Sequence, residues 1–233
     1  MTNIAATYAT QLMTWFRSHS DPVKAIPMSA YMKNQYAFLG IQTPDRNALL
    51  KRFVLEHGRP DGEQMLEQVV RLLWEAPERE FQNVAMSLLD TGKKRPEQSR
   101  IDLLEALIQH KSWSDTVDYL ASNAAGKYFV HYPEQIAHYP DRWIHSDNLW
   151  LRRSALLYQL NYKERTDEER LFRYIRTCAQ EKEFFITKAI GWALRQYART
   201  NPAAVVAFVE RERLQPLSKR EAIKRLVLDK KER

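Results

Sequence analysis

Three short stretches of the sequence combine tryptophan with charged residues at spacings that fit helices. They are residues 111–118, 146–153 and 188–195. Such side chains suit chemistry on a charged polymer, because arginine binds phosphate and an aromatic ring face favours a cation. Each of these residues also has a structural explanation as an alternative to a functional one. A tryptophan on an amphipathic helix usually packs in the core, and Asp118 alone could pair with a basic residue. The pair Arg152–Arg153 is unusual for the apolar face of a helix and favours a functional role.

Motifs for nucleotide, cofactor and metal sites are absent from the sequence. There is neither GxxxxGK[ST] nor GxGxxG in a chain with six glycines. The six histidines show neither HExxH nor Cys/His ligand spacing, and Pro140 interrupts the helix face that His138 and His145 could share. Cys178, the single cysteine, has no motif around it. We therefore expect no cofactor, no metal and a buried, unreactive thiol.

Basic residues are concentrated in the last third of the chain, within a formal net charge of +7. Residues 1–150 hold 16 Lys and Arg against 18 Asp and Glu, whereas residues 151–233 hold 20 against 11. This surplus indicates a polyanionic partner such as DNA. The alternative is a solvated helical surface that happens to be basic.

Composition and hydropathy indicate an all-α protein of the cytoplasm. Helix-forming residues are abundant and no Val/Ile/Thr-rich alternating run indicates a sheet. A lone cysteine forms no intramolecular disulfide, so nothing points to an oxidising compartment. No apolar stretch approaches eighteen residues, and the first twenty residues lack the pattern of a signal peptide. We expect a cytoplasmic protein with no membrane span.

A repeat accounts for the arrangement of these helices. Six alanines recur at spacings of 37, 36, 34, 34 and 33 residues. Each stands four residues after an apolar residue or a proline, except the last, which follows a serine at that spacing. They are Ala48, Ala85, Ala121, Ala155, Ala189 and Ala222. A small residue on the second helix of each pair lets the next helix approach closely, so stacked pairs bury one continuous core. We expect a single domain over residues 1–233, built as a solenoid with a concave face.

Capping residues predict where several helices begin. Thr43 before Pro44 reads as an N-cap, and Asp147 or Asn148 can cap the helix that carries Leu151. Ser218 with Glu221 reads as a capping box at the start of the last helix. Apolar spacing predicts first helices of pairs over residues 62–76 and 97–110.

Together with several other segments, the three stretches resemble the AlkD family of bacterial alkylpurine DNA glycosylases. The similarity runs in order from about residue 20 to residue 228. The other segments are residues 31–34, 39–44, 77–82 and 217–224. The resemblance implies an all-α, right-handed solenoid of about six HEAT-like helical repeats with a concave DNA-binding cleft, in agreement with the alanine repeat.

The resemblance also implies an activity in base excision repair. It is hydrolysis of the N-glycosidic bond of cationic alkylated purines, chiefly 3-methyladenine and 7-methylguanine, in double-stranded DNA. Most glycosylases flip the base out of the helix. This family is known instead for binding the DNA backbone and leaving the base unflipped. A cationic base is already a good leaving group, so the protein needs mainly to stabilise an oxocarbenium-like sugar. We expect a monomer whose partner is alkylated duplex DNA.

Residue by residue, Asp118 corresponds to the family's catalytic carboxylate and Arg153 to the arginine that contacts the backbone near the lesion. Trp192 and Tyr31 match aromatics that line the cleft, whose ring faces favour a cationic sugar. The resemblance thus implies Asp118, Arg153 and Trp192 as the catalytic residues. The expected DNA-binding residues are Tyr31, Gln42, Thr43, Ser114, Lys188, Arg195, Lys219 and Arg220. The alanine register alone does not bring Asp118, Arg153 and Trp192 together, so their convergence is implied by the resemblance.

One position departs from the family pattern, which has two tryptophans where this chain reads Trp113-Ser114. The second of these is the aromatic that packs against the lesion sugar. Ser114 and Asp118 share a helix face, whereas Trp113 is expected to be rotated by about 100° from Ser114; we interpret Trp113 and Trp150 as packing residues. Two alternatives therefore stay open: a binder of damaged or branched DNA that does not cut, and a solenoid scaffold that binds protein.

Overall fold

Helices form all the regular structure in residues 4–90 and 95–231, the part of the chain that this computed structural model describes; for residues 225–231 it describes the backbone alone. In that part the only β-type pairing is an isolated bridge between Ala37 and Glu78. The all-α prediction is therefore confirmed. Contacts divide the chain into two compact units, Met1–Glu97 and Gln98–Arg233, and each is described by itself. The single domain expected over residues 1–233 stays a prediction.

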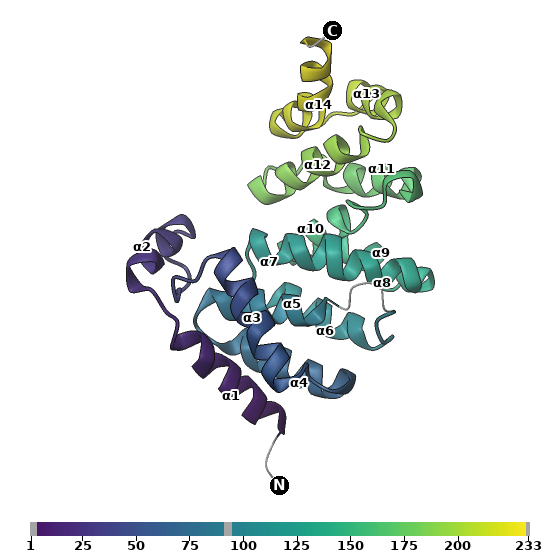
Figure 1. Ribbon diagram of the computed structural model, residues 1–233. Coiled ribbons are helices and arrows are strands. Elements are labelled where there is room, and N and C mark those ends of the chain that lie inside the picture. The colour runs from purple at the N-terminus through teal and green to yellow at the C-terminus, as the bar shows by residue number, and fades with distance from the viewer. Residues whose placement is uncertain (1–3, 91–94, 232–233) are drawn as a thin grey trace. The chain divides into compact units, whose positions relative to one another are not determined.

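The first unit is built from helices that pack against one another (Figure 1). In α4, the side chains of Val69, Val70 and Leu73 are completely buried, and α4 contacts both α1 and α5. The helices of this unit are α1 (Ile4–Arg17), α2 (Pro22–Tyr31), α3 (Thr43–His57), α4 (Gly62–Glu75) and α5 (Arg79–Leu89).

A buried carboxylate joins two of the sequence segments on which the family resemblance rests. Glu80, in residues 77–82, is completely buried. It accepts backbone N–H groups from Leu39 at 3.0 Å, Gly40 at 3.0 Å and Ile41 at 3.1 Å. Gly40 has φ +85°, and a Cβ there would lie 1.9 Å from the carbonyl oxygen of Asp21. Glu80 and Gly40 thus fix the loop that leads into α3.

The second unit repeats a pairing of helices along the chain. Helix α10 packs on α12 and α12 on α14, while α11 and α13 lie beside them (Figure 1). This agrees with the predicted helical repeat. The elements are α6 (Arg100–Gln109), α7 (Ser114–Tyr119), a π-helix (Leu120–Ala125), α8 (Gly126–His131), a 3-10 turn (Pro133–Ile136), α9 (Pro140–Trp143), α10 (Leu149–Leu157), a 3-10 turn (Lys163–Arg165), α11 (Glu168–Cys178), α12 (Phe184–Tyr197), α13 (Pro202–Arg211) and α14 (Pro216–Lys231).

The repeat alanines are buried at five of the six positions. Those five, each at most 2% exposed, are Ala85, Ala121, Ala155, Ala189 and Ala222. Ala48 is exposed, so the register is wrong at the first repeat. The reason is that α3 buries the face with Leu49, Leu50 and Phe53, which leaves Ala48 outside it.

The predicted helix starts were right in part. Asn148 caps α10, because its side chain accepts the N–H groups of Trp150 and Leu151. Thr43 is the first residue of α3, and its neighbour Gln42 holds the cap position without a side-chain bond. The capping box at Ser218 was wrong. Helix α14 begins at Pro216, and the Ser218 hydroxyl donates to the carbonyl of Thr187 in the neighbouring helix α12 at 2.9 Å.

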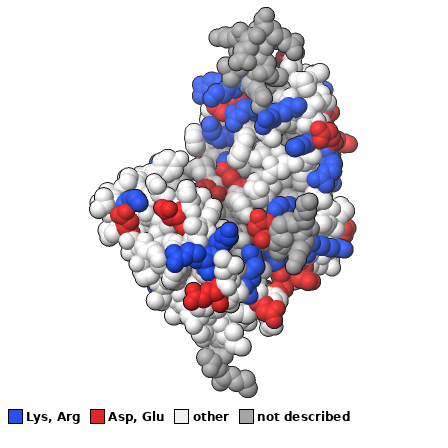
Figure 2. Space-filling view, in the orientation of Figure 1, with Lys and Arg blue, Asp and Glu red and all other residues white. Residues whose placement is uncertain are grey.

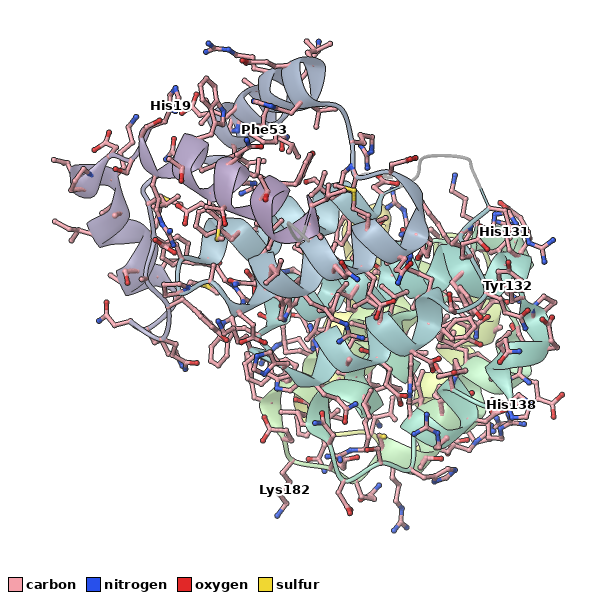
Figure 3. The ribbon with its side chains drawn as sticks, turned by 90° about the horizontal axis from the view of Figure 1, so that it is seen from below. His19, Phe53, His131, Tyr132, His138 and Lys182 are labelled. Atoms are coloured by element: carbon pink, nitrogen blue, oxygen red, sulfur yellow. The ribbon has the colours of Figure 1, made fainter. Side chains whose placement is uncertain are left out.

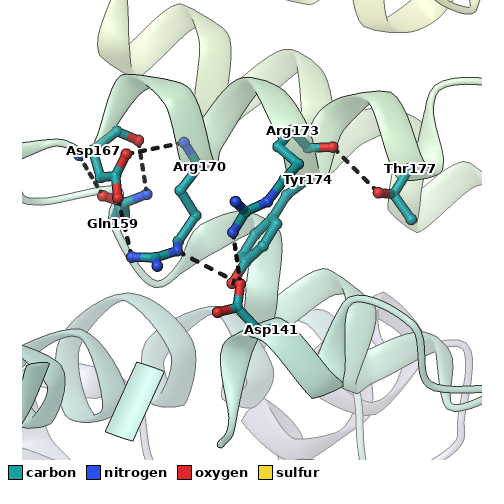
Figure 4. A network of polar contacts seen from close by, with 7 residues as sticks. All are labelled: Asp141, Gln159, Asp167, Arg170, Arg173, Tyr174 and Thr177. Atoms are coloured by element: carbon teal, nitrogen blue, oxygen red, sulfur yellow. Dashed lines mark hydrogen bonds and ion pairs between the residues drawn. The ribbon is translucent and has the colours of Figure 1, made fainter. Parts of the chain in front are cut away.

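A polar network fixes α11 against α9 (Figure 4). Asp141 of α9 accepts the hydroxyl of Tyr174 at 2.6 Å and the guanidinium of Arg173 at 2.9 Å. Burial and the neighbouring carboxylate raise the pKa of Tyr174, so it stays a hydrogen-bond donor. Gln159, just after α10, exchanges hydrogen bonds with the backbone of Asp167, the N-cap of α11. These contacts hold α11 in a fixed position beside α9 and α10.

Among the described residues, no helix combines the length and apolar character that a membrane crossing requires.

Candidate active site

Asp118 and Arg153 form a bidentate ion pair between α7 and α10. The guanidinium donates from Nε to Oδ1 at 2.7 Å and from Nη2 to Oδ2 at 2.9 Å. It also donates from Nη1 to the backbone carbonyl of Phe185 at the start of α12. The Arg153 side chain is 5% exposed and that of Asp118 is 22% exposed. Three helices therefore hold one carboxylate in a fixed orientation while part of it still faces solvent.

The electrostatic setting of Asp118 differs from that of a surface aspartate. Burial raises the pKa of its carboxyl group above the ordinary 3.8, and the charge of Asp115 adds to this effect. The guanidinium of Arg153 opposes both. The result is a carboxyl group that accepts a proton more readily than an exposed aspartate does.

A break in helix regularity follows Asp118 directly. Helix α7 passes into the π-helix Leu120–Ala125 and then into α8, and π-turns recur at functional sites because they shift the side chains around them. The hydroxyl of Ser122 donates to the Asp118 carbonyl at 2.6 Å. At Gly126 an added Cβ would lie 2.5 Å from the carbonyl oxygen of Tyr158, so only glycine lets the end of α10 approach this closely.

An aromatic cluster of Trp113, Trp150 and Phe185 adjoins the ion pair. Their ring centroids lie 5.3 Å apart for Trp113–Phe185, 4.9 Å for Trp150–Phe185 and 6.2 Å for Trp113–Trp150. The Arg153 guanidinium is 5.9 Å from the Phe185 ring centre. All three rings are half-buried, and Phe184 beside them is 57% exposed. The cluster therefore reaches the ion pair through the Phe185 ring and the Arg153 guanidinium.

Sequence reasoning missed the place of Phe185 in this site, because it treated that residue only as a marker of the repeat. The sequence offered only a weak signal, the adjacent aromatic residues Phe184 and Phe185. The structure shows the first exposed and the second half-buried. Trp113 also differs from expectation. It precedes α7 with an extended backbone, φ −153° and ψ 165°, so the helical rotation of 100° does not describe its position. Ser114 and Asp118 do share α7 at the expected spacing.

Three further candidates lie along one half-buried stripe of α12. Lys188, Trp192 and Arg195 follow Phe185 at intervals of three, seven and ten residues, which places all four on one side of a helix. Trp192 is seven residues beyond Phe185, roughly 10 Å farther along the helix axis. In the described part of the chain Trp192 shows no hydrogen bond or ring contact with Asp118 or Arg153. The structure thus joins Asp118 to Arg153, and no contact among the described residues links Trp192 to either.

The remaining DNA-binding candidates lie near helix ends, most of them at N-termini. In the second unit, Lys219 is half-exposed and Arg220 exposed in the first turns of α14. In the first unit, Tyr31 ends α2 with 87% of its surface exposed. Gln42 and Thr43 are exposed at the N-terminus of α3, where free backbone N–H groups favour an anion.

Within residues 4–90 and 95–231, no group of three or more His, Cys, Asp or Glu residues has the geometry to hold a metal ion. His131 and His138 lie along one edge of the second unit with Tyr132 between them (Figure 3). Cys178 is completely buried, and burial raises the pKa of its thiol to about 12. The predicted burial of this thiol is confirmed, and its low reactivity stays a prediction.

Comparisons with known proteins extend these observations. A family model described as "DNA alkylation repair enzyme" matches residues 12–226. A solved structure described as "Predicted DNA alkylation repair enzyme from Enterococcus faecalis" is similar over 89% of this chain and 96% of its own, with 36% sequence identity and a TM-score of 0.81. Among curated proteins no match was found. The family match includes Asp118, Arg153 and the aromatic cluster.

Proposed function

The chain belongs to the family of DNA alkylation repair enzymes, and from this premise we propose that it is a DNA glycosylase. It hydrolyses the N-glycosidic bond of cationic alkylated purines, chiefly 3-methyladenine and 7-methylguanine, in duplex DNA and without flipping the base. It works as a cytoplasmic monomer with no cofactor or metal. The observation that carries this proposal is the partly exposed Asp118 carboxylate, fixed by Arg153 beside half-buried aromatic rings.

In this reaction the main task of the protein is to stabilise positive charge on the sugar. As the bond between C1′ and the purine nitrogen breaks, its electron pair neutralises the cationic base and leaves an oxocarbenium-like sugar. Asp118 stabilises that cation in a partly buried setting, where a fixed charge acts more strongly than in water. Water then adds to C1′ and loses a proton, which the carboxylate accepts or passes to solvent. A pKa raised by burial suits this proton transfer.

Arg153 serves chiefly as a positioning residue in this account. Three of its N–H donors are used by Asp118 and the Phe185 carbonyl, and its side chain is 5% exposed. Two of the five donors of a guanidinium are left for the expected contact with the DNA backbone. Trp192 remains a proposed catalytic aromatic. The proposed DNA contacts are Tyr31, Gln42, Thr43, Lys188, Arg195, Lys219 and Arg220.

Ser114 favours a second candidate, a relative that binds damaged DNA without cutting it, because an aromatic surface is missing one turn before Asp118. We expect Ser114→Trp to raise the single-turnover rate of 7-methylguanine release about tenfold, since one cation–π surface contributes roughly 1–2 kcal/mol. Ser114→Leu is the matched control, as it adds apolar bulk without a π face. An equal gain in both variants would exclude the cation–π explanation.

The pH dependence of base release follows from the environment of Asp118. The carboxylate form is active, so release falls as pH drops through its pKa, which burial raises above 3.8. We expect the acidic limb of the rate profile to lie above the ordinary range of aspartate. Asp115→Asn removes a charge that raises this pKa and should move the limb to lower pH. A limb that does not move in Asp115→Asn would contradict the assignment to Asp118.

The proposal is tested by comparing a cationic base with neutral ones. Duplexes carrying 7-methylguanine, uracil or hypoxanthine at one position are incubated with the protein, and free bases are measured by mass spectrometry. We expect release of 7-methylguanine alone, because only a cationic base leaves without further activation. Release of the neutral bases at a similar rate would overturn the proposed mechanism.

A further inference from the structure

Two of the residues expected to bind DNA, Lys188 and Arg195, share one acidic partner. Glu221 of α14 lies 3.6 Å from the Nζ of Lys188 through Oε1, and its Oε2 pairs with Nη1 of Arg195. The Arg195 Nη1 also donates to the backbone carbonyl of Glu221 at 3.3 Å. The Glu221 side chain is 13% exposed, whereas Lys188 and Arg195 are 39% and 30% exposed. A largely buried carboxylate thus holds two partly exposed cations.

The position of Glu221 depends on a close approach of two helices. A Cβ at Gly191 would lie 2.5 Å from the Cβ of Glu221 and 3.1 Å from the carbonyl oxygen of Ser218. The completely buried Ser218 hydroxyl fixes the same contact through the Thr187 carbonyl. Gly191 stands three residues after Lys188 and four before Arg195, so Glu221 sits between the two cations on the α12 stripe.

The charges of this cluster leave room for an anion. The ion pair with Arg195 lowers the pKa of Glu221, with Lys188 and Lys224 contributing, so the carboxylate stays ionised. Glu221 occupies the Nη1 end of the Arg195 guanidinium. The Nε and Nη2 edge has no hydrogen-bond partner among the residues whose side chains are described, and that edge matches a phosphate bidentately. Lys and Arg side chains gather over α12 and α14 in Figure 2.

We propose that Glu221 is a positioning residue that holds Lys188 and Arg195 as a two-pronged clamp for one backbone phosphate of duplex DNA. The identity of the partner rests on the proposed function. Fixing two flexible cations before DNA arrives lowers the entropy cost of binding. This gain outweighs the repulsion between phosphate and the carboxylate, because Glu221 is largely buried and faces the far side of the guanidinium from the free edge.

The test measures affinity for undamaged duplex DNA, which does not require base release. We expect Glu221→Gln to weaken the Kd about tenfold, since two side chains are then ordered only on binding. In a Lys188→Ala/Arg195→Ala background the same substitution should change nothing, because its partners are gone. Glu212→Gln is the matched control: it removes a carboxylate that pairs with Arg176 and leaves the affinity unchanged or slightly tighter.

Equal or tighter binding by Glu221→Gln would overturn the proposal, because the carboxylate would then act only as a repulsive charge. Equal weakening in both backgrounds would also overturn it and show a purely structural role. If Glu221→Gln does not fold, the affinity of Arg195→Lys is measured instead. This substitution keeps the positive charge but removes the Nε–Nη2 edge. Wild-type affinity in Arg195→Lys would contradict the proposed clamp. Wild-type protein that binds no duplex would instead refute the proposed function.

Discussion

Asp118→Asn is expected to lower the rate of 7-methylguanine release by a factor of about 10²–10³, the usual cost of removing one group that stabilises charge in a transition state. The amide keeps the shape of the side chain and one acceptor for Arg153, but it carries no negative charge toward the sugar. The measurement is a single-turnover rate on a duplex with one lesion, so DNA binding does not enter.

Asp115→Asn is the control for that substitution, because it removes a nearby exposed carboxylate on the same helix. It should retain nearly the full rate at neutral pH. The free energy of unfolding of both variants should be measured in urea, since neutralising Asp118 leaves the buried Arg153 with a weaker partner. A folded Asp118→Asn protein with the wild-type rate would remove Asp118 from the mechanism.

Glu80→Gln has the largest expected effect on stability. Its completely buried carboxylate accepts three backbone N–H groups in the loop before α3. The amide places an NH₂ group where an N–H now donates, so we expect a loss of about 2–3 kcal/mol in the free energy of unfolding. Urea denaturation with tryptophan fluorescence measures it.

Glu67→Gln is the matched control for Glu80, because Glu67 forms an exposed i,i+4 pair with Arg71 on α4. Pairs of that kind contribute well under 1 kcal/mol, and the variant should unfold close to wild type. Equal losses in the two variants would show that the contacts of Glu80 with the loop are not what stabilises the first unit.

Much of the fold could be predicted from the sequence because it depends on local patterns. Buried alanines such as Ala155 and Ala189 mark the second helix of each pair, and Asn148 caps α10 as its residue type indicates. The capping box at Ser218 failed because a tertiary contact overrode the local rule. Gly191 lets α14 approach so closely that Ser218 bonds a neighbouring helix instead.

The candidate site was less accessible to sequence reasoning. The alanine register does not bring Asp118 and Arg153 together, so their pairing could be expected only through the family resemblance. The bonding partners of the Phe185 carbonyl and of the Glu221 carboxylate could not be predicted. Arg153 reaches the first, and Lys188 and Arg195 reach the second, only when helices far apart in sequence pack. The position of Trp113 depended on where α7 begins, and it lies one residue before that start.

The central claim, that this chain cleaves the glycosidic bond of cationic purines, is tested most directly by counting products. Methylated duplex DNA is incubated with the wild-type protein, and free 7-methylguanine and abasic sites are quantified in the same sample. Both products should appear in equal numbers and at a rate well above that of the DNA alone. Tight binding of the methylated duplex with neither product above the background would contradict it.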